Sequence, residues 1–263
     1  MAERAADSGG RRRVGDTLLD LGVTLLCWAW FVGGFLLIFS WAYLFVWLLA
    51  RDREGGFQRL NHQFFRVFFR LLTASARRHK LCIDPRLATI RGAVVVCNHL
   101  SYLDPLFLVA LFPRHRTIVK TRFFSTPIFG AMIARSGYLP ATGEGRHASL
   151  FLQGMESMSA YLAAGGNLFI FPEGTRSRDG LLGPFHPGAL KIARMCRAPI
   201  YVLRLSGSDR LFTPGRFLFN AHLANTIAVD LLGRLEANGD KPAGVAELDR
   251  RLRQVFSGQS PRE

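Results

Sequence analysis

The stretch that decides the fold reads AVVVCNHLSYLDP and runs from Ala93 to Pro105. Its first part, Ala93–Val96, is a continuous apolar run, which is typical of a strand buried on both faces of a parallel sheet. Its end, Asp104-Pro105, indicates the start of a helix, because proline is favoured at the first helical position. The stretch therefore predicts a strand, a short turn and a helix in succession.

Outward from this unit, short β-rich runs alternate with helical ones, which is the pattern of an α/β domain. We expect further strands at Leu81–Ile83, Thr117–Val119, Leu168–Phe171 and Ile200–Leu205, and an edge strand at Phe217–Leu223. We expect further helices at Thr126–Ser136, His147–Ala163, Gly188–Arg197 and Val245–Phe256. The predicted fold class is α/β, with a mixed, largely parallel sheet flanked by helices.

An apolar segment near the N-terminus predicts a membrane anchor at residues 16–54, after a polar basic tail at residues 1–15. Residues 21–50 carry no charged side chain, and about 20 apolar residues suffice to cross a bilayer. Two geometries fit: one long, tilted helix, or a helical hairpin that breaks near Gly33-Gly34, since glycine pairs are a known cause of kinks. Arginines on both flanks slightly favour the hairpin, because cytoplasmic loops collect positive charge.

Residues 55–80 combine apolar and basic positions in a helical pattern. Phenylalanine and leucine recur near helical spacing, and arginines lie between them. One interpretation is a basic amphipathic helix on a membrane surface. The other is a helix that packs on the core and exposes its basic face to solvent.

The chain of 263 residues has a formal net charge of +15. Such a surface attracts phosphates, either in nucleic acid or in an anionic lipid leaflet. The four cysteines form no CxxC pair, so a zinc finger or a disulfide framework is not expected. No motif of nucleotide-binding loops, of α/β-hydrolases or of common nucleic-acid-binding modules is present. A non-catalytic, basic membrane-binding protein stays open as an alternative.

His99 and Asp104 are candidates for acid–base chemistry. They flank the turn between the predicted strand and helix, so the carboxylate can fold back onto the imidazole. A neutral histidine held by a carboxylate is a competent general base, and it could take the proton of a hydroxyl that attacks a thioester. The alternative is that Asp104 only caps the helix.

A second segment, PEGTR, follows the predicted buried strand and strengthens the catalytic interpretation. Gly174 permits a tight turn, and Arg176 offers a bidentate donor suited to phosphate. Glu173 could hydrogen-bond an acceptor hydroxyl or hold a nearby arginine. Taken alone, the segment could also be a turn with a surface arginine.

Together the two segments resemble the glycerolipid acyltransferase family that includes 1-acylglycerol-3-phosphate acyltransferase. The family's NHxxxxD block is matched by Asn98, His99 and Asp104, and its FPEGTRS block by residues 171–177. The resemblance covers roughly residues 60–230. It implies that residues 55–256 form an acyltransferase domain that ends before a disordered tail at residues 257–263.

The resemblance also implies roles for single residues. His99 is the general base and Asp104 orients it. The expected substrate-binding residues are Asn98, Lys120, Glu173, Gly174, Thr175 and Arg176. No metal and no cofactor are implied. The donor is acyl-CoA or acyl-carrier protein, the acceptor is a lysophospholipid, and no nucleic-acid partner is expected.

Two departures from the family pattern bear on the acceptor. Gly143 stands where the second block has an arginine for phosphate, and Val202 lies near the place of a proline in the fourth block. Arg135 and Arg146 are possible substitutes for the missing arginine. The favoured acceptor is 1-acylglycerol-3-phosphate, and the alternative is another lysolipid, such as a lyso-amino-acid lipid. The predicted location is the inner cell membrane, with the site facing the cytoplasm.

Overall fold

The structure is a computed structural model that describes residues 13–177, 179–236 and 244–258. Its centre is a seven-stranded sheet in the order β1-β7-β6-β2-β5-β3-β4. The strands are β1 (His79–Ile83), β2 (Val94–Cys97), β3 (His115–Val119), β4 (Leu139–Pro140), β5 (Asn167–Ile170), β6 (Ile200–Ser206) and β7 (Asn225–Leu235). All neighbouring strands are parallel except β6 and β7. The predicted class, a mixed and largely parallel sheet, is confirmed.

β2 lies in the middle of the sheet between β5 and β6, as its apolar sequence predicts. Val94 pairs with Leu168 of β5 and with Ile200 of β6, and all four residues of β2 are buried. Because β2, β5 and β6 are parallel, their carboxyl ends meet at one edge of the sheet. Both segments singled out from the sequence begin at this edge.

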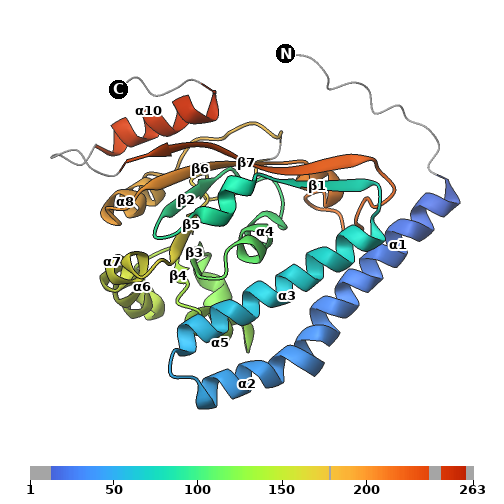
Figure 1. Cartoon of the computed structure of the whole chain (residues 1–263), viewed down its shortest axis with the longest axis horizontal. Helices are drawn as coiled ribbons and strands as arrows, with labels where there is room; N and C mark the ends of the chain where they lie inside the picture. The colour runs from blue at the N-terminus through green and yellow to red at the C-terminus, as the bar shows by residue number, and fades with distance from the viewer. Residues whose placement is uncertain (1–12, 178, 237–243, 259–263) are drawn as a thin grey trace.

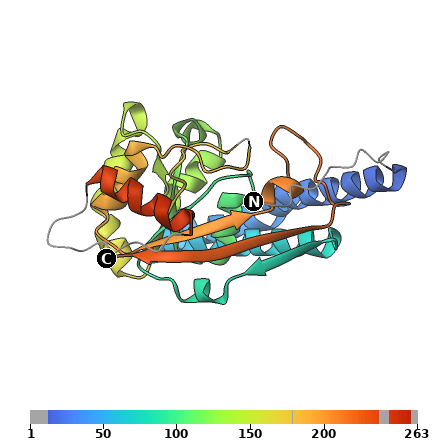
Figure 2. The ribbon, with the colours of Figure 1, turned by 90° about the horizontal axis from the view of Figure 1, so that it is seen from above.

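Helices cover both faces of the sheet (Figures 1 and 2). They are α4 (Asp104–Leu111), α5 (Phe129–Arg135), α6 (Ala148–Glu156), α7 (Met158–Ala163), α8 (Pro187–Met195), α9 (Ser208–Leu211) and α10 (Val245–Phe256). Short 3-10 turns lie at η2 (Pro85–Thr89), η3 (Thr121–Ser125) and η4 (Gly145–His147). Val95 of β2 joins the core on the α4 side, whereas Val94 joins the core beneath α7, α8 and α10.

The N-terminal apolar segment is one continuous helix. It consists of α1 (Val14–Ala29), a π-helical stretch η1 (Trp30–Phe39) and α2 (Ser40–Leu49). By length and composition, Val14–Leu49 is the one helix among the described residues that could cross a membrane. Of the two predicted geometries, the structure has the single long helix. The predicted hairpin break near Gly33-Gly34 is wrong, because the two glycines lie within η1, where the helical backbone continues.

The chain turns back only after this helix. Asp52 caps α3 (Arg53–Ser75) by accepting a hydrogen bond from the backbone N–H of Gly55 at 2.9 Å. α3 then runs beside the long helix toward the sheet (Figure 1). A hairpin therefore exists, but its second arm is α3, which covers most of the predicted amphipathic segment 55–80.

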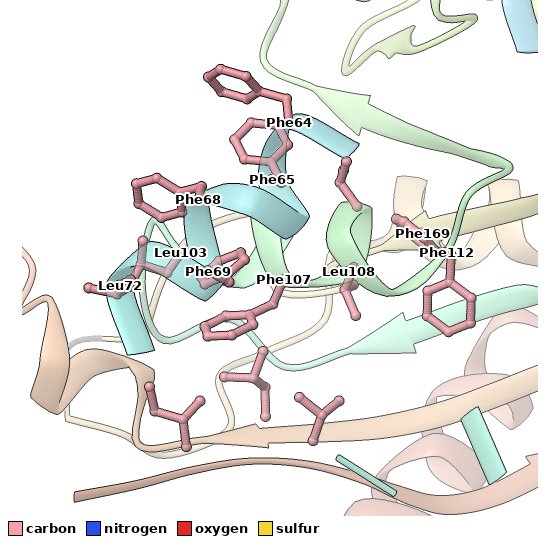
Figure 3. Packing of buried hydrophobic residues seen from close by; sticks show 14 of the residues in the cluster. Phe64, Phe65, Phe68, Phe69, Leu72, Leu103, Phe107, Leu108, Phe112 and Phe169 are labelled. Carbon is pink, nitrogen blue, oxygen red and sulfur yellow. The ribbon is translucent and has the colours of Figure 1, made fainter. Parts of the chain in front are cut away.

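α3 packs on the core rather than offering its apolar face to a membrane. The ring of Phe69 in α3 stacks on that of Phe107, the one phenylalanine of α4, with centroids 3.8 Å apart (Figure 3). On α3, Arg59 and Arg70 are exposed. Of the two interpretations of this segment, the structure supports the packed helix with a solvated basic face.

Two predicted elements differ from the structure, and two strands, β4 and β7, were missed. Phe217–Leu223 is irregular and not a strand, because its backbone bonds locally and to α1. The neighbouring β7 was not predicted, although it pairs with both β1 and β6. The predicted helix His147–Ala163 is divided at Ser157 into α6 and α7. The predicted tails lie largely outside the described residues.

Candidate active site

His99 and Asp104 form the centre of the site. His99 leaves the end of β2, and Asp104 is the first residue of α4. Nδ1 of His99 lies 3.0 Å from Oδ2 of Asp104. The side chain of Asp104 is fully buried, while that of His99 is 17% exposed. The turn between strand and helix therefore folds the carboxylate onto the imidazole, as the spacing predicts.

Asp104 accepts three further hydrogen bonds. Its Oδ2 accepts from the backbone N–H groups of Leu100 and Ser101, at 2.5 and 2.7 Å. Its Oδ1 accepts from the hydroxyl of Ser208, at 2.5 Å. The N-cap position of α4 is held by Leu103, not by Asp104. The capping alternative is therefore wrong, since the carboxylate faces the turn before the helix.

This bonding pattern sets the tautomer of the imidazole. A carboxylate only accepts, so in the neutral ring of His99 the proton is on Nδ1 and the lone pair is on Nε2. No hydrogen bond to Nε2 comes from the residues that the structure describes. The ring of Phe171 packs against the imidazole, with centroids 4.5 Å apart. The arrangement is an oriented imidazole with one basic nitrogen available.

Glu173 joins the two segments through their backbones. Its Oε1 accepts from the backbone N–H of His99 at 3.0 Å, and its Oε2 accepts from that of Gly183 at 2.9 Å. The backbone N–H of Ser177 also donates to the carbonyl of His99, at 2.7 Å. Glu173 is buried and holds the loop after β5 against the turn after β2.

Arg176 lies over the ring of Tyr102. Its guanidinium carbon is 3.4 Å from the ring centroid. One terminal nitrogen, Nη1, is buried and has no hydrogen-bond partner within the described parts of the chain. Arg176 also lines a cleft of about 420 Å³, together with Glu173 and Thr175. A buried cationic donor without a partner, at the rim of a cleft, suits an anionic ligand.

The other predicted residues occupy different places. The Asn98 side chain donates to the carbonyl of Leu205 at 2.9 Å and accepts from its N–H at 2.7 Å, so it ties β2 to β6. Gly174 has a φ of +64°, which explains the glycine, and Thr175 is exposed. Lys120 is exposed at the end of β3, on the same edge of the sheet but outside this network.

The possible substitutes for the missing second-block arginine bind elsewhere. The guanidinium of Arg135 lies 5.8 Å from the ring centroid of Trp47 in α2. Arg146 donates to Ser125 and to His147. Neither arginine bonds to the segment that contains Arg176.

Sequence reasoning missed two residues at the site, Tyr102 and Ser208. Tyr102 lies inside the first block and supports Arg176 by a cation–π contact. Ser208 follows β6, whose carboxyl end lies beside that of β2. The position of Ser208 just after the predicted strand Ile200–Leu205 could have indicated it, because side chains that follow the ends of neighbouring parallel strands are expected to meet.

Within the described residues, no group of three or more His, Cys, Asp or Glu is placed to hold a metal ion. A second cleft, of about 500 Å³, opens beside Asn98 and Leu100 and reaches Phe256 at the end of α10. The two clefts adjoin at Leu181 and Leu182, and Asn98 and Glu173, which flank His99 in the hydrogen-bond network, each line one of them.

Comparisons with known proteins say what this chain is similar to. A family model described as "Acyltransferase" matches residues 82–206, slightly less than half of the chain. A chloroplastic 1-acyl-sn-glycerol-3-phosphate acyltransferase of Brassica napus is 33% identical over 122 residues, which are 46% of this chain and 35% of that protein. A 1-acyl-sn-glycerol-3-phosphate acyltransferase of Cocos nucifera is 27% identical over 198 residues, 74% of this chain and 58% of that protein. The chain thus spans less than two thirds of each relative's length.

A solved structure supports the fold. The 1-acyl-sn-glycerophosphate acyltransferase PlsC of Thermotoga maritima superposes with a TM-score of 0.66 at 21% identity, covering 94% of this chain and 96% of that one. The resemblance found in the two sequence blocks is confirmed, and residues 82–206 carry the pattern of the acyltransferase family. More particularly, the chain is similar to 1-acyl-sn-glycerol-3-phosphate acyltransferases.

Proposed function

We propose that this protein is an O-acyltransferase that moves a fatty acyl chain from a thioester donor to the hydroxyl of a lysophospholipid. The observation that carries the proposal is the His99–Asp104 pair, with Nδ1 held by a buried carboxylate and Nε2 unbonded. The similarity of residues 82–206 to the acyltransferase family supports the same reaction.

In the proposed reaction, Nε2 of His99 removes the proton from the acceptor hydroxyl as its oxygen attacks the thioester carbonyl. A carbon–oxygen bond forms, and the carbonyl becomes a tetrahedral oxyanion. When that intermediate collapses, the carbon–sulfur bond breaks and the thiolate leaves. The imidazolium returns the proton to the thiolate, and Asp104 stabilises the imidazolium meanwhile. The nucleophile comes from the substrate, so no covalent enzyme intermediate is needed.

Arg176 supports a phosphate-bearing acceptor, and 1-acylglycerol-3-phosphate is the favoured one. Its half-buried guanidinium lines the cleft and keeps donor capacity for a charge-assisted hydrogen bond to a phosphate oxygen. Glu173 has both oxygens engaged by backbone N–H groups. Its proposed role is to hold the loop that carries Arg176, in place of the direct contact with the acceptor expected from the sequence. Acyl-CoA and acyl-carrier protein both fit the donor chemistry, and no cofactor is required.

A second candidate acceptor is a lysolipid without a terminal phosphate. It is favoured by Gly143 in place of the second-block arginine and by the contacts of Arg135 and Arg146 with other partners. A panel of lysolipids with one labelled donor decides between the two. Clear preference for lysophosphatidic acid would dismiss this candidate.

The membrane is the proposed site of action. The long helix Val14–Leu49 keeps most of its apolar surface exposed outside its contact with α3, and lysophospholipids reside in membranes. We assign the protein to the inner cell membrane with its site on the cytoplasmic side.

The test is His99→Ala in the full-length protein in lipid or detergent. We expect a folded protein whose acyl transfer falls by roughly 10³-fold, because general-base catalysis contributes about 10²–10⁴-fold. His186→Ala is the matched control: its exposed imidazole caps α8 and pairs with no carboxylate in the part of the chain that the structure describes. Unchanged acyl transfer by folded His99→Ala would refute the proposed mechanism.

A further inference from the structure

Ser208 holds the oxygen of Asp104 that faces away from His99. The residue is fully buried, and its hydroxyl donates to Oδ1 of Asp104 at 2.5 Å. Oδ2 of the same carboxylate serves the imidazole and two backbone N–H groups. Ser208 thus donates a hydrogen bond to Oδ1 across 104 residues of sequence.

We propose that Ser208 is a positioning residue for catalysis, which acts through Asp104 on the imidazole of His99. The inference rests on the proposed function, and it adds a residue that neither sequence block contains. A carboxylate bonded through only one oxygen can rotate about its own bonds. Donors on both oxygens fix the plane of the carboxylate, and that plane sets the direction of the imidazole.

The local backbone places Ser208 with little freedom. Gly207 has a φ of +74°, and a Cβ at this position would collide with the carbonyl oxygen of Thr226 in β7. The side chain of Asn225 donates to the carbonyl of Gly207 at 2.7 Å. The turn after β6 is therefore clamped onto β7, and it presents the Ser208 hydroxyl to Asp104.

The segment that follows connects this turn to the N-terminal helix. The hydroxyl of Ser101 donates to the carbonyl of Phe212 at 3.0 Å. Farther along, the backbone N–H of Phe219 donates to the Thr24 hydroxyl at 2.9 Å. We name residues 207–223 the bridge segment, because one end contacts the catalytic turn and the other contacts α1. The position of Ser208 is thus supported from β7 on one side and from the N-terminal helix on the other.

The hydroxyl also affects how readily His99 binds a proton. A donor to Asp104 disperses the carboxylate charge that stabilises the imidazolium. Its loss makes the carboxylate more basic and raises the pKa of His99. Among the described residues, the ionisable groups near the pair include Glu173 and Arg176 on the loop after β5, Tyr102 in the turn between the pair, and Cys97 on β2. The pKa of the Cys97 thiol is raised by burial and by the charge of Asp104.

The experiment compares Ser208→Ala with Ser136→Ala in the full-length protein. Both serines are fully buried, but Ser136 bonds to Asn61 and Met132, away from the site. For Ser208→Ala we expect a loss in kcat of about tenfold with a smaller change in KM, because orienting partners typically contribute about 10–100-fold. We also expect the acid limb of kcat/KM to move to higher pH. Ser136→Ala should lower stability without moving that limb.

An NMR titration of the His99 imidazole provides a readout that does not depend on acyl transfer. We expect the His99 pKa to rise in Ser208→Ala and to stay unchanged in Ser136→Ala. Equal kcat and an unmoved titration in Ser208→Ala would overturn the inference, while inactivity of His99→Ala would still support the proposed function. If folded His99→Ala kept its activity, the proposed function would fail, and the titration alone would decide whether Ser208 sets the basicity of His99.

Discussion

Two buried carboxylates stand within the site, and their hydrogen bonds assign them different tasks. Asp104 binds an imidazole and a hydroxyl of two side chains, besides the backbone N–H groups of its own turn. Glu173 binds the backbone N–H groups of His99 and Gly183. Asp104 therefore acts on the chemistry of His99, whereas Glu173 acts on the position of the two loops that form the site.

Glu173→Gln tests this division of tasks. The amide keeps one acceptor oxygen, but its NH₂ group then faces a backbone N–H, so one buried donor loses its partner. We expect the free energy of unfolding to fall by about 1–3 kcal/mol and kcat/KM to fall about tenfold. Thermal unfolding and steady-state kinetics measure the two effects. Glu236→Gln, at an exposed ion pair with Arg234, is the control, and an equal loss there would contradict the assignment.

At the scale of residues, the sequence indicated which residues belong to the site better than it indicated what their side chains contact. The His99–Asp104 pair follows from a short turn, so local spacing sufficed to predict it. Asn98 and Glu173 were expected to bind substrate, yet their side chains bind the backbones of β6 and of two loops. Those partners become neighbours only when distant strands pair, which local spacing does not encode. Ser208 was missed for the same reason.

Among the elements, the long N-terminal helix carries an unusual buried acid. Asp20 lies in α1 between two leucines, and its side chain is fully buried, which is unusual for an acidic residue. Its carboxylate accepts from the backbone N–H of His222 at 3.0 Å and lies 2.8 Å from the imidazole Nδ1. With the bond between Thr24 and Phe219, this contact fastens the helix to the bridge segment. The helix is therefore joined to the catalytic domain as well as to α3.

Asp20→Ala should weaken that attachment. The substitution leaves two donors of His222 without their acceptor, and an unsatisfied buried donor costs about 1–3 kcal/mol. We expect a lower unfolding temperature in detergent and a modest loss of kcat through the bridge segment. Asp16→Ala is the control on the same helix, since Asp16 bonds only weakly to the N–H of Arg13, at 3.3 Å. Equal unfolding temperatures for the two variants would show that the contact with His222 stabilises nothing.

The long helix also shows what element prediction from sequence could achieve. Its apolar length was predicted, but the choice between one long helix and a break near Gly33-Gly34 stayed open; the structure has the long helix and includes both glycines in a π-helical stretch. Such a stretch keeps the backbone hydrogen bonds that a break would lose. β7 was missed while Phe217–Leu223 was preferred. The aromatic residues of the latter segment pack against α1, as in the stacking of Phe217 on Trp28, rather than in a sheet.

The whole molecule has two different faces on either side of its sheet. α3 and the long N-terminal helix cover one face, and α8 and α10 cover the other (Figure 1). The long helix exposes large apolar side chains along most of its length, whereas α8 exposes basic residues and the single large apolar residue Met195. This asymmetry predicts that the protein meets a lipid bilayer with the N-terminal helix. The net charge of +15 then adds attraction to anionic lipid.

Matched substitutions on the two faces test that orientation. Leu37, in η1, is 77% exposed, and Met195, in α8, is 62% exposed. Leu37→Asp places a charge where we expect lipid, and a central aspartate costs a membrane helix about 2.5–3.5 kcal/mol. We therefore expect binding to anionic vesicles to weaken by tenfold or more in co-sedimentation. Met195→Asp should bind as the wild type does, because its face points away from the bilayer. Equal weakening in both variants would mean that charge, and not the apolar helix, determines membrane binding. Unchanged binding in both would place the contact on another surface.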